Sequence, residues 1–500
     1  MYICYSSPAC AGLLKYGLST QFGTKDYHKT TTMPPPINHP PQDINRTTIQ
    51  LRPQSVAFSY LLTHETICPW LTIVNKPLAK SCISVTCKHT ILPLVKPALS
   101  SVNKINPLLN VFSFAGGGAE LYLCSLMINK DIHIGVLGGG QLGGMLIRHA
   151  IDFGIYIKIL DSSPDATCAR YTNNFVLGDT LDYDAVMAFG KGMDIITIEK
   201  EAVNVDALEA LAKQGVQVHP NPAVIRIVQD KYSQKDFLQQ HGIPVSPGIL
   251  IKDKKELNKY KDRLPAVLKL CRDGYDGKGV MMLKTEADIE KAFDAPCVLE
   301  DLVAIRKELG VIVSRNAQGE IKCYDPVEMV FNKQLNLLDY QLAPAEITDR
   351  NAAQAKDLAI RTAEALGLVG ILAVEMFLTI DDEILVNELA PRPHNSGHHT
   401  IEACVTSQYE QLLRAILGMP PGDTTAHKKS VMINILEPAE DNKAQLERTF
   451  KAVLDTKDAH LHWYGKKNSK EGRKVGHITV NGDSISEAVS KAEAIRNHAK

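Results

Sequence analysis

The chain has 500 residues, of which 45% are hydrophobic and 22% are charged, and its formal net charge is −1. This length exceeds one hydrophobic core, so we expect two to four domains of ordinary globular composition. The near-zero charge excludes a global attraction to nucleic acid or anionic membranes, and no run of 18 apolar residues would span a bilayer. We therefore expect small-molecule ligands. A cytoplasmic location is also expected, because the eleven cysteines show neither metal-site nor disulfide spacing.

The first 126 residues differ in composition from the rest of the chain. They hold ten basic but only four acidic residues, six of the eleven cysteines and several proline pairs. No helical or strand period is sustained in them. We interpret residues 1–126 as a low-order extension, or as sequence that precedes a later start at Met127.

From residue 128 onward the pattern predicts an α/β fold. An apolar run at 132–137 reads as a buried strand; a helical pattern at 142–153 and a second strand at 155–160 follow it. A third strand is expected at 195–198 and a helix at 205–214. A charged helix at 230–241 opens the next region, where strands at 266–270 and 280–283 flank a glycine loop. Later strands are expected at 308–314, 373–379, 383–389, 431–436 and 475–480, with a helix from 484.

The first glycine loop, residues 138–143, satisfies G-x-G-x-x-G at a strand-to-helix turn, and Asp161 ends the next strand. This pattern is typical of a dinucleotide site, because glycines admit a phosphate and an acid holds a ribose. The same turn also binds other phosphates or simply packs a helix on a strand. Taken alone, the loop leaves all three interpretations open.

The second glycine loop, residues 272–279, follows Lys269 and contains Lys278. Glycines with basic residues between two strands suit a flap over nucleotide phosphates, although an ordinary hairpin would look similar. The segment 300–303 then offers backbone groups for an adenine edge between two domains. Glu308 follows at a spacing suited to a ribose.

Carboxylates for a metal are predicted on two strands that pair across a turn at 381–382. Glu375 lies among apolar residues, and Asn387 and Glu388 end the returning strand. An acid in such surroundings requires a cation, and an all-oxygen set suits Mg²⁺.

A polar segment at 390–399 follows the metal candidates directly. Arg392, His394 and Asn395 are donors for an anion such as bicarbonate. Zinc binding by the three histidines of this segment is the weaker alternative, because no cysteine or acid accompanies them at metal spacing. Lys466, Arg473 and Lys474 form a later basic cluster that suits a substrate phosphate, or a solvated turn.

Taken together, these motifs resemble the 5-(carboxyamino)imidazole ribonucleotide synthases, ATP-dependent carboxylases of purine synthesis. The motifs that carry the resemblance occur in order at 138–143, 273–279, 387–392, 394–398, 462–464 and 472–477. The resemblance implies an ATP-grasp fold after the extension. Its domains would be a Rossmann-like pre-ATP-grasp domain (127–228), a small domain with the flap (229–304) and a large domain with a β-rich C-terminal region (305–500). It also implies that the first loop binds a nucleotide substrate's phosphate, not NAD.

The implied reaction joins bicarbonate to 5-aminoimidazole ribonucleotide with hydrolysis of ATP to ADP, in a homodimer. The resemblance assigns ATP binding to Lys231, Lys269, Gly274, Tyr275, Asp276, Gly277, Lys278, Gly279, Glu300, Asp301, Leu302, Val303, Glu308, Asn387 and Glu388. It assigns Mg²⁺, with Mn²⁺ as an alternative, to Glu375 and Glu388. The catalytic residues would be Arg392, His394, Asn395 and Lys278. The ribonucleotide would meet Gln141, Leu142, Glu199, Tyr275, Arg392, Lys466, Arg473 and Lys474.

Some positions depart from the family pattern, and three other functions share parts of it. Lys200 stands between two acids where a hydrophobic residue or alanine is common, Lys231 stands where arginine is common, and Glu328 occupies a variable position. A formate-using ATP-grasp transformylase is the nearest alternative function. A nicotinamide-dependent oxidoreductase rests on the first loop alone. A non-catalytic nucleotide-binding module is disfavoured because both metal carboxylates are present.

Overall fold

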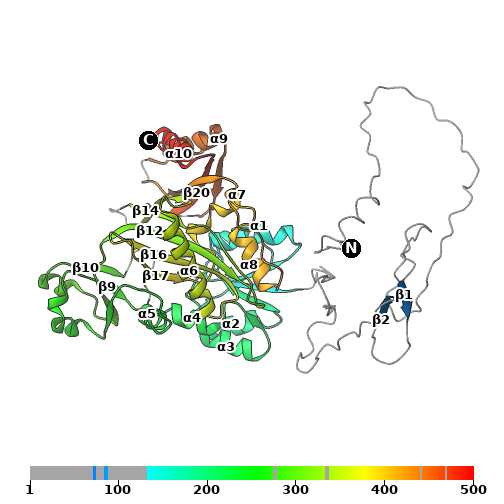
Figure 1. Ribbon diagram of the computed structural model, residues 1–500, viewed down its shortest axis with the longest axis horizontal. Coiled ribbons are helices and arrows are strands. Elements are labelled where there is room, and N and C mark those ends of the chain that lie inside the picture. Colours follow the sequence, from blue (N-terminus) through cyan, green and yellow to red (C-terminus); the bar gives the residue numbers. More distant parts are fainter. Residues whose placement is uncertain are drawn as a thin grey trace, which may run out of the picture. The chain divides into compact units, whose positions relative to one another are not determined.

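The computed structural model describes residues 71–74, 84–87 and 132–500, apart from residues 273, 275–278, 333–336, 440–441, 468–469 and 500. The chain divides into two compact units, Met1–Met127 and Ile128–Lys500. In the first unit, strands β1 (Leu71–Val74) and β2 (Ser84–Cys87) pair antiparallel. The rest of the interpretation of residues 1–126 lies outside the described residues. Everything below concerns the second unit (Figure 1).

The second unit begins with a five-stranded parallel sheet, in the order β5-β4-β3-β6-β7. Its strands are β3 (Ile134–Leu137), β4 (Ile157–Asp161), β5 (Phe175–Leu177), β6 (Ile195–Ile198) and β7 (Gln217–Val218). Helix α1 (Gln141–Asp152) covers one face, and α2 (Tyr183–Gly190) with α3 (Val205–Lys213) covers the other. Both faces are therefore apolar, as a parallel sheet between helix layers requires. The predicted βαβ unit is confirmed, whereas β5, β7 and α2 were not expected.

Two helices lead into a small antiparallel sheet. Helices α4 (Pro222–Val228) and α5 (Lys231–Gln240) are followed by β8 (Gly248–Ile251), β9 (Ala266–Leu270), β10 (Val280–Leu283) and β11 (Cys297–Asp301). The strand order is β10-β9-β11-β8, so the glycine motif at 272–279 connects neighbouring strands. Short 3-10 turns lie between the strands: η3 (Lys254–Lys259), η4 (Lys261–Arg263) and η5 (Glu286–Lys291).

The large sheet has nine strands in the order β17-β16-β12-β14-β15-β18-β20-β19, with β13 paired to β12. Their bounds are β12 (Ile305–Arg315), β13 (Ile321–Cys323), β14 (Val327–Asn332), β15 (Leu337–Ala343), β16 (Gly370–Thr379), β17 (Ile384–Ala390), β18 (Lys429–Leu436), β19 (Ala459–Trp463) and β20 (Lys474–Gly482). The predicted strands at 383–389, 431–436 and 475–480 therefore belong to one continuous sheet with those at 308–314 and 373–379.

Side-chain alternation directs the two faces of β12 and β16 to different helices. Val311 and Val374 pack with α6 (Asp349–Ala365) in one core cluster. Ile312 and Ala373, their strand neighbours, pack with α8 (Gln408–Ile416) in another. That second cluster also contains residues of α1, so α8 joins the large sheet to the first domain. The turn η6 (Asn395–Gly397) and helix α7 (Thr400–Ala403) lead into α8, and η2 (Thr167–Arg170) lies beside α1.

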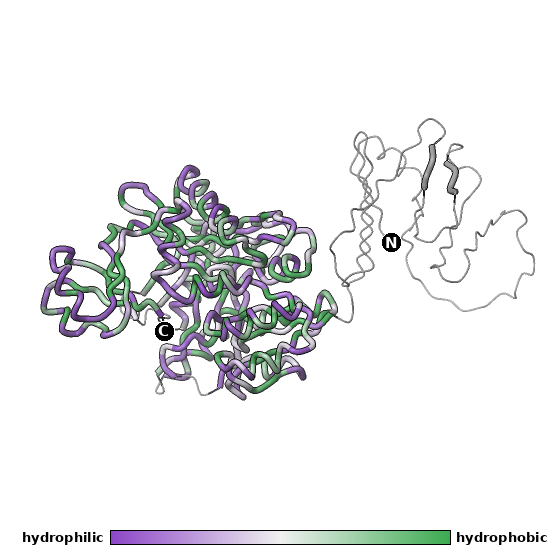
Figure 2. Tube along the Cα trace, turned by 90° about the horizontal axis from the view of Figure 1, so that it is seen from below, coloured by the Kyte–Doolittle hydropathy of each residue, from purple (hydrophilic) through white to green (hydrophobic). Residues whose placement is uncertain are grey.

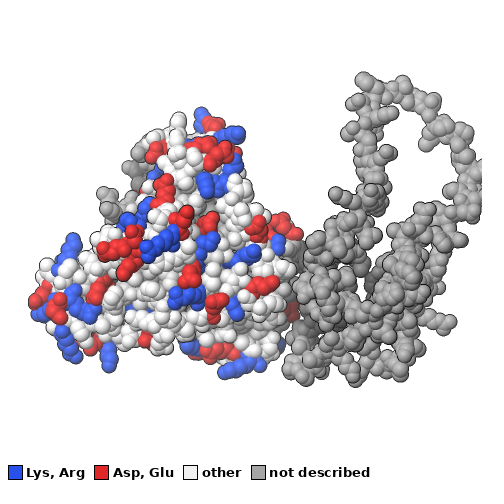
Figure 3. Space-filling model, in the orientation of Figure 1, with Lys and Arg blue, Asp and Glu red and all other residues white. Residues whose placement is uncertain are grey.

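Helices α9 (Ala444–Asp455) and α10 (Ile485–Ala499) cover one face of β18, β19 and β20 with an apolar layer. The strands of the unit's interior are mostly hydrophobic in Figure 2. Acidic and basic side chains are interspersed over the face drawn in Figure 3, in agreement with the near-zero net charge. None of the described helices combines the length and apolarity needed to cross a membrane.

Candidate active site

The first glycine loop is fastened by Asp161, which the dinucleotide interpretation would assign to a ribose. Gly138 adopts a φ of 108°, which favours glycine. The Gly139 N–H donates to Asp161 Oδ2 (2.8 Å), and the Ser163 N–H donates to Oδ1 (2.9 Å). Both carboxylate oxygens therefore hold the loop and the end of β4. This geometry gives Asp161 a structural role and removes the main support for a dinucleotide site.

Glu199, at the end of β6, closes over the same loop. Its Oε1 accepts the Leu142 N–H (3.2 Å), and a Cβ added to Gly140 would lie 2.4 Å from that oxygen. Burial raises the pKa of Glu199 to about 6, although the nearby Arg392 guanidinium lowers it. The structure thus brings Gln141, the first residue of α1, and Leu142 to one corner with Glu199, within the electrostatic reach of Arg392.

Lysines line the opposite side of the site, between the small and large sheets. The Lys269 ammonium lies 2.8 Å from Glu300 Oε2 and donates to Asn387 Oδ1 (2.8 Å). Lys235, which was not predicted, lies 3.0 Å from the other Glu300 oxygen. Burial would raise the pKa of Glu300, but the two lysines outweigh burial and hold it below its ordinary value. A buried carboxylate therefore fixes Lys269 in place.

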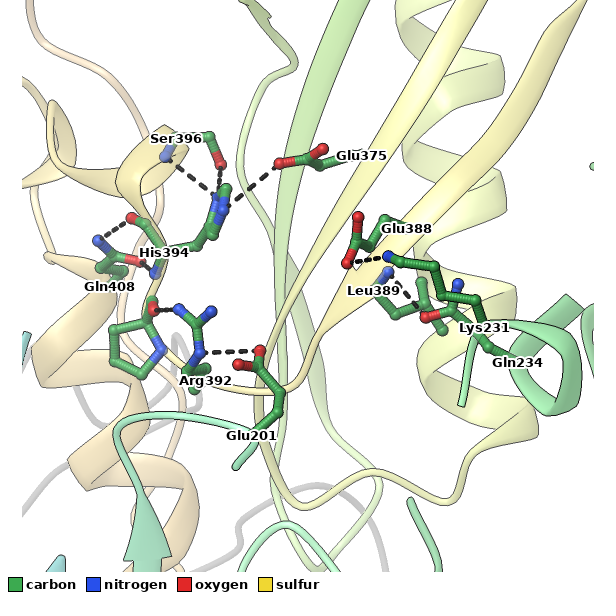
Figure 4. Close-up of polar contacts among 11 residues, drawn as sticks. Glu201, Lys231, Gln234, Glu375, Glu388, Leu389, Arg392, His394, Ser396 and Gln408 are labelled. Carbon is green, nitrogen blue, oxygen red and sulfur yellow. Dashed lines mark hydrogen bonds and ion pairs between the residues drawn. The ribbon is translucent and has the colours of Figure 1, made fainter. Parts of the chain in front are cut away.

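The predicted metal carboxylates lie side by side on neighbouring strands; in Figure 4 Glu375 points toward His394, and Glu388 lies next to Lys231. Glu375 on β16 is paired in register with Glu388 on β17. The Lys231 ammonium lies 2.6 Å from Glu388 Oε1. Burial, followed by the charges of Glu388 and Glu308, raises the pKa of Glu375 to about 7. The charge of Glu308 acts on Glu375, and burial raises the pKa of Glu308 above its ordinary value although Lys269 opposes the shift; its assignment to a ribose stays a prediction.

These carboxylates fit a divalent cation whose remaining ligands come from a bound nucleotide. Within the described ranges, no three His, Cys, Asp or Glu side chains form a complete metal site. Glu375 and Glu388 would supply two oxygen ligands, and a bound cation would relieve the repulsion between their charges. The zinc alternative finds no support, because His394, His398 and His399 do not form such a group among the described residues.

The polar loop after β17 approaches the carboxylates from the other side (Figure 4). Arg392 Nε lies 2.8 Å from Glu201 Oε1, and His394 Nε2 lies 3.4 Å from Glu375 Oε1. Burial, Arg392 and Lys474 lower the pKa of His394 to about 3, so its ring is neutral at pH 7.

The tautomer of His394 follows from its neighbour in the loop. The Ser396 N–H donates to His394 Nδ1 (3.2 Å), so Nδ1 is the acceptor and the ring proton resides on Nε2. His394 therefore directs an N–H toward the carboxylates. Asn395 Nδ2 is buried without a hydrogen-bond acceptor among the described residues, which leaves it available to a ligand.

The remaining predicted residues are only partly brought together. Gly274 and Gly279 are described, and Gly279 adopts a φ of 82°, whereas Tyr275, Asp276, Gly277 and Lys278 lie outside the described residues. In the hinge, Asp301 pairs with Arg263 and its N–H donates to Pro247 O, while the assignment of residues 300–303 to an adenine stays a prediction. Lys466 Nζ donates to Lys474 O (2.8 Å), whereas the Arg473 side chain is exposed.

The sequence did not predict the residues that hold the site residues in position through ion pairs and hydrogen bonds. Glu201 pairs with Arg392, Lys235 with Glu300, and Gln408 binds the main chain of His394. For Gln408 the available signal was polarity in an apolar context, since it opens the largely apolar buried face of α8; Lys235 lies in the charged helix α5, where no such signal marks it.

Comparisons with known proteins identify the class. An ATP-grasp domain matches residues 236–409, a ribonucleotide synthetase preATP-grasp domain matches 132–229, and a phosphoribosylaminoimidazole carboxylase C-terminal domain matches 430–491. The chain is therefore an ATP-grasp enzyme, a ligase that uses ATP. Its predicted fold class is confirmed.

Individual relatives define the family within that class. The chain is 40% identical to the N5-carboxyaminoimidazole ribonucleotide synthase of Bacillus subtilis, over 69% of this chain and 90% of that protein. It is 36% identical to the chloroplastic phosphoribosylaminoimidazole carboxylase of Vigna aconitifolia, of which it spans 65%. The chain belongs to the N5-carboxyaminoimidazole ribonucleotide synthase family, as its motifs predicted.

Solved structures agree with this assignment. The synthetase of Thermotoga maritima is 38% identical with a TM-score of 0.66, and the match covers 73% of this chain and 98% of that one. The Aspergillus clavatus synthase, in complex with ADP and 5-aminoimidazole ribonucleotide, is 32% identical with a TM-score of 0.69. That match covers 74% of this chain and 99% of the other.

Proposed function

We propose that the chain carboxylates 5-aminoimidazole ribonucleotide with ATP and bicarbonate, releasing ADP, phosphate and the 5-carboxyamino product in purine biosynthesis. The observation that carries the proposal is the contact between His394 and Glu375, 3.4 Å apart. This contact joins the polar loop to a pair of carboxylates suited to Mg-ATP, so phosphate transfer and carboxyl transfer would share one site. The family membership supports the same reaction.

The ATP side would activate bicarbonate. Lys231, Lys269 and the glycine loop at 274–279 would hold the phosphates, with the adenine at the hinge. Glu375 and Glu388 would bind Mg²⁺, which neutralises charge on the transferred phosphoryl group. Bicarbonate oxygen attacks the γ-phosphorus, ADP leaves and carboxyphosphate forms. No enzyme nucleophile is needed.

The polar loop would bind carboxyphosphate and orient it toward the amine of the ribonucleotide. Arg392 is oriented by Glu201, and the His394 Nε2–H and the Asn395 amide add further donors for carboxyphosphate. The ribonucleotide amine then bonds to the carboxyl carbon, the bond from that carbon to the phosphate oxygen breaks, phosphate leaves, and the amine loses one proton. Gln141, Leu142, Glu199, Lys466, Arg473 and Lys474 would bind this substrate. From the family resemblance we further infer a cytoplasmic homodimer.

The test is ADP release by the full chain with Mg-ATP and bicarbonate, with and without 5-aminoimidazole ribonucleotide. We expect the ribonucleotide to stimulate release, and Glu388→Ala to abolish the stimulation. A folded protein that binds ATP but shows no stimulation would contradict the substrate assignment.

A further inference from the structure

Gln408 holds the main chain of His394 through both ends of its side-chain amide. The His394 N–H donates to Gln408 Oε1 (2.9 Å), and Gln408 Nε2 donates to His394 O (2.8 Å). The Gln408 amide thus satisfies both main-chain hydrogen-bonding groups of His394, as the backbone of a neighbouring strand would in a sheet (Figure 4). Gln408 is fully buried, so water does not compete for either bond.

The clamp is itself fixed in position. Gln408 is the first residue of α8, and its own N–H donates to Thr400 Oγ1 (2.9 Å). The side chain of Ser407 caps the helix by accepting the Glu410 N–H (3.1 Å). Gly397 leaves the required space, because a Cβ there would lie 2.4 Å from Gln408 Oε1.

We propose that Gln408 is a positioning residue that acts through His394, and this inference rests on the proposed function. The His394 ring contacts Glu375 on one side, while Gln408 holds its main chain on the other. Without the clamp, the loop would lose the placement that directs carboxyphosphate to the amine. In productive turnover, carboxyphosphate releases phosphate and its CO₂ joins the amine with loss of a proton. In the unproductive branch that CO₂ returns to bicarbonate with water, so the net reaction is ATP hydrolysis.

The same helix supplies a matched control. Gln411 is also fully buried; its Nε2 donates to Gly422 O (2.7 Å), and the Gly422 N–H donates to its Oε1 (3.1 Å). The two glutamines thus make the same kind of clamp, but Gln411 holds a segment that contains no predicted site residue. A merely structural role predicts equal consequences for the two substitutions.

The experiment compares Gln408→Met with Gln411→Met in the full chain by measuring ADP and carboxylated ribonucleotide together. We expect one product per ADP for wild type and Gln411→Met. For Gln408→Met we expect product formation to fall about 10–100-fold, the ADP-to-product ratio to rise, and the KM for ATP to change little. The pair Gln408→Asn and Gln411→Asn repeats the test with a retained amide if the methionine variants do not fold.

Equal coupling and equal rates in the two variants of a pair would overturn the role of Gln408. Wild-type enzyme that forms no carboxylated product would instead overturn the proposed function together with this inference.

Discussion

Glu375→Gln should stabilise the ligand-free protein while it abolishes turnover. The ordinary pKa of this side chain is 4.5, and in the fold it rises to about 7 because of burial, Glu388 and Glu308. Each tenfold change in proton affinity is worth about 1.4 kcal/mol. The ionised carboxylate therefore costs the folded state about 3 kcal/mol at pH 8.5. The substitution removes that cost.

The sign of the pH dependence follows from the raised pKa. The folded state holds the proton of Glu375 more tightly than the unfolded state does. The loss of folding stability that its ionisation causes therefore begins above pH 4.5 and reaches its full value above pH 7. At pH 5.5 it is about 1.4 kcal/mol by the same conversion. At about 2 °C per kcal/mol, the variant should melt about 6 °C above wild type at pH 8.5 and about 3 °C above it at pH 5.5.

Thermal unfolding of the full chain without metal, at both pH values, is the assay. Glu383→Gln, on the exposed turn of the same hairpin, is the control and should change little. Added Mg-ATP should raise the melting temperature of wild type more than that of Glu375→Gln. If the variant is no more stable than wild type at pH 8.5, burial and the neighbouring carboxylates do not destabilise ionised Glu375 in the ligand-free protein, and the reasoning is refuted.

Three further predictions concern the surrounding charges. Lys231→Met should raise the KM for ATP about tenfold, whereas Lys231→Arg, which can still pair with Glu388, should retain most of the affinity for ATP. Equal increases of the KM for ATP in the two variants, measured by steady-state kinetics, would show that this ion pair is unimportant. Glu201→Gln should lower kcat/KM about 10–100-fold, because it leaves Arg392 without its partner. Adding Glu201→Gln to Arg392→Met should lower kcat/KM little further. Fully additive losses in the double-mutant cycle would show that Glu201 does not act through Arg392. On the acidic side of the pH profile, kcat/KM should fall near pH 7 at limiting Mg²⁺. This pH should decrease as Mg²⁺ increases, because a cation favours ionised Glu375. If the pH of the fall does not depend on Mg²⁺, a group other than Glu375 causes it.

Local patterns predicted the parts of the site that one strand or one loop carries. Glu375 and Glu388 were expected to face each other because apolar alternation marked two strands around a short turn, and the register pairs them. The order of glycine loops and polar motifs was enough for the fold class and the family.

Contacts between distant segments were beyond such patterns. Arg392 contacts Glu201, and Lys269 contacts Asn387, only after separate domains pack together. The spacing of Glu308 in the sequence does not show that the antiparallel pairing of β12 with β16 brings its charge near Glu375, which only the fold reveals. Periodicity alone does not specify which buried polar side chain meets which backbone.

Transfer of ¹³C from labelled bicarbonate to the ribonucleotide, measured together with ADP, tests the central claim most directly. The proposed reaction predicts one labelled carboxyl group in the ribonucleotide product for each ADP released. Release of ADP that depends on the ribonucleotide but leaves no ¹³C in it would contradict the claim.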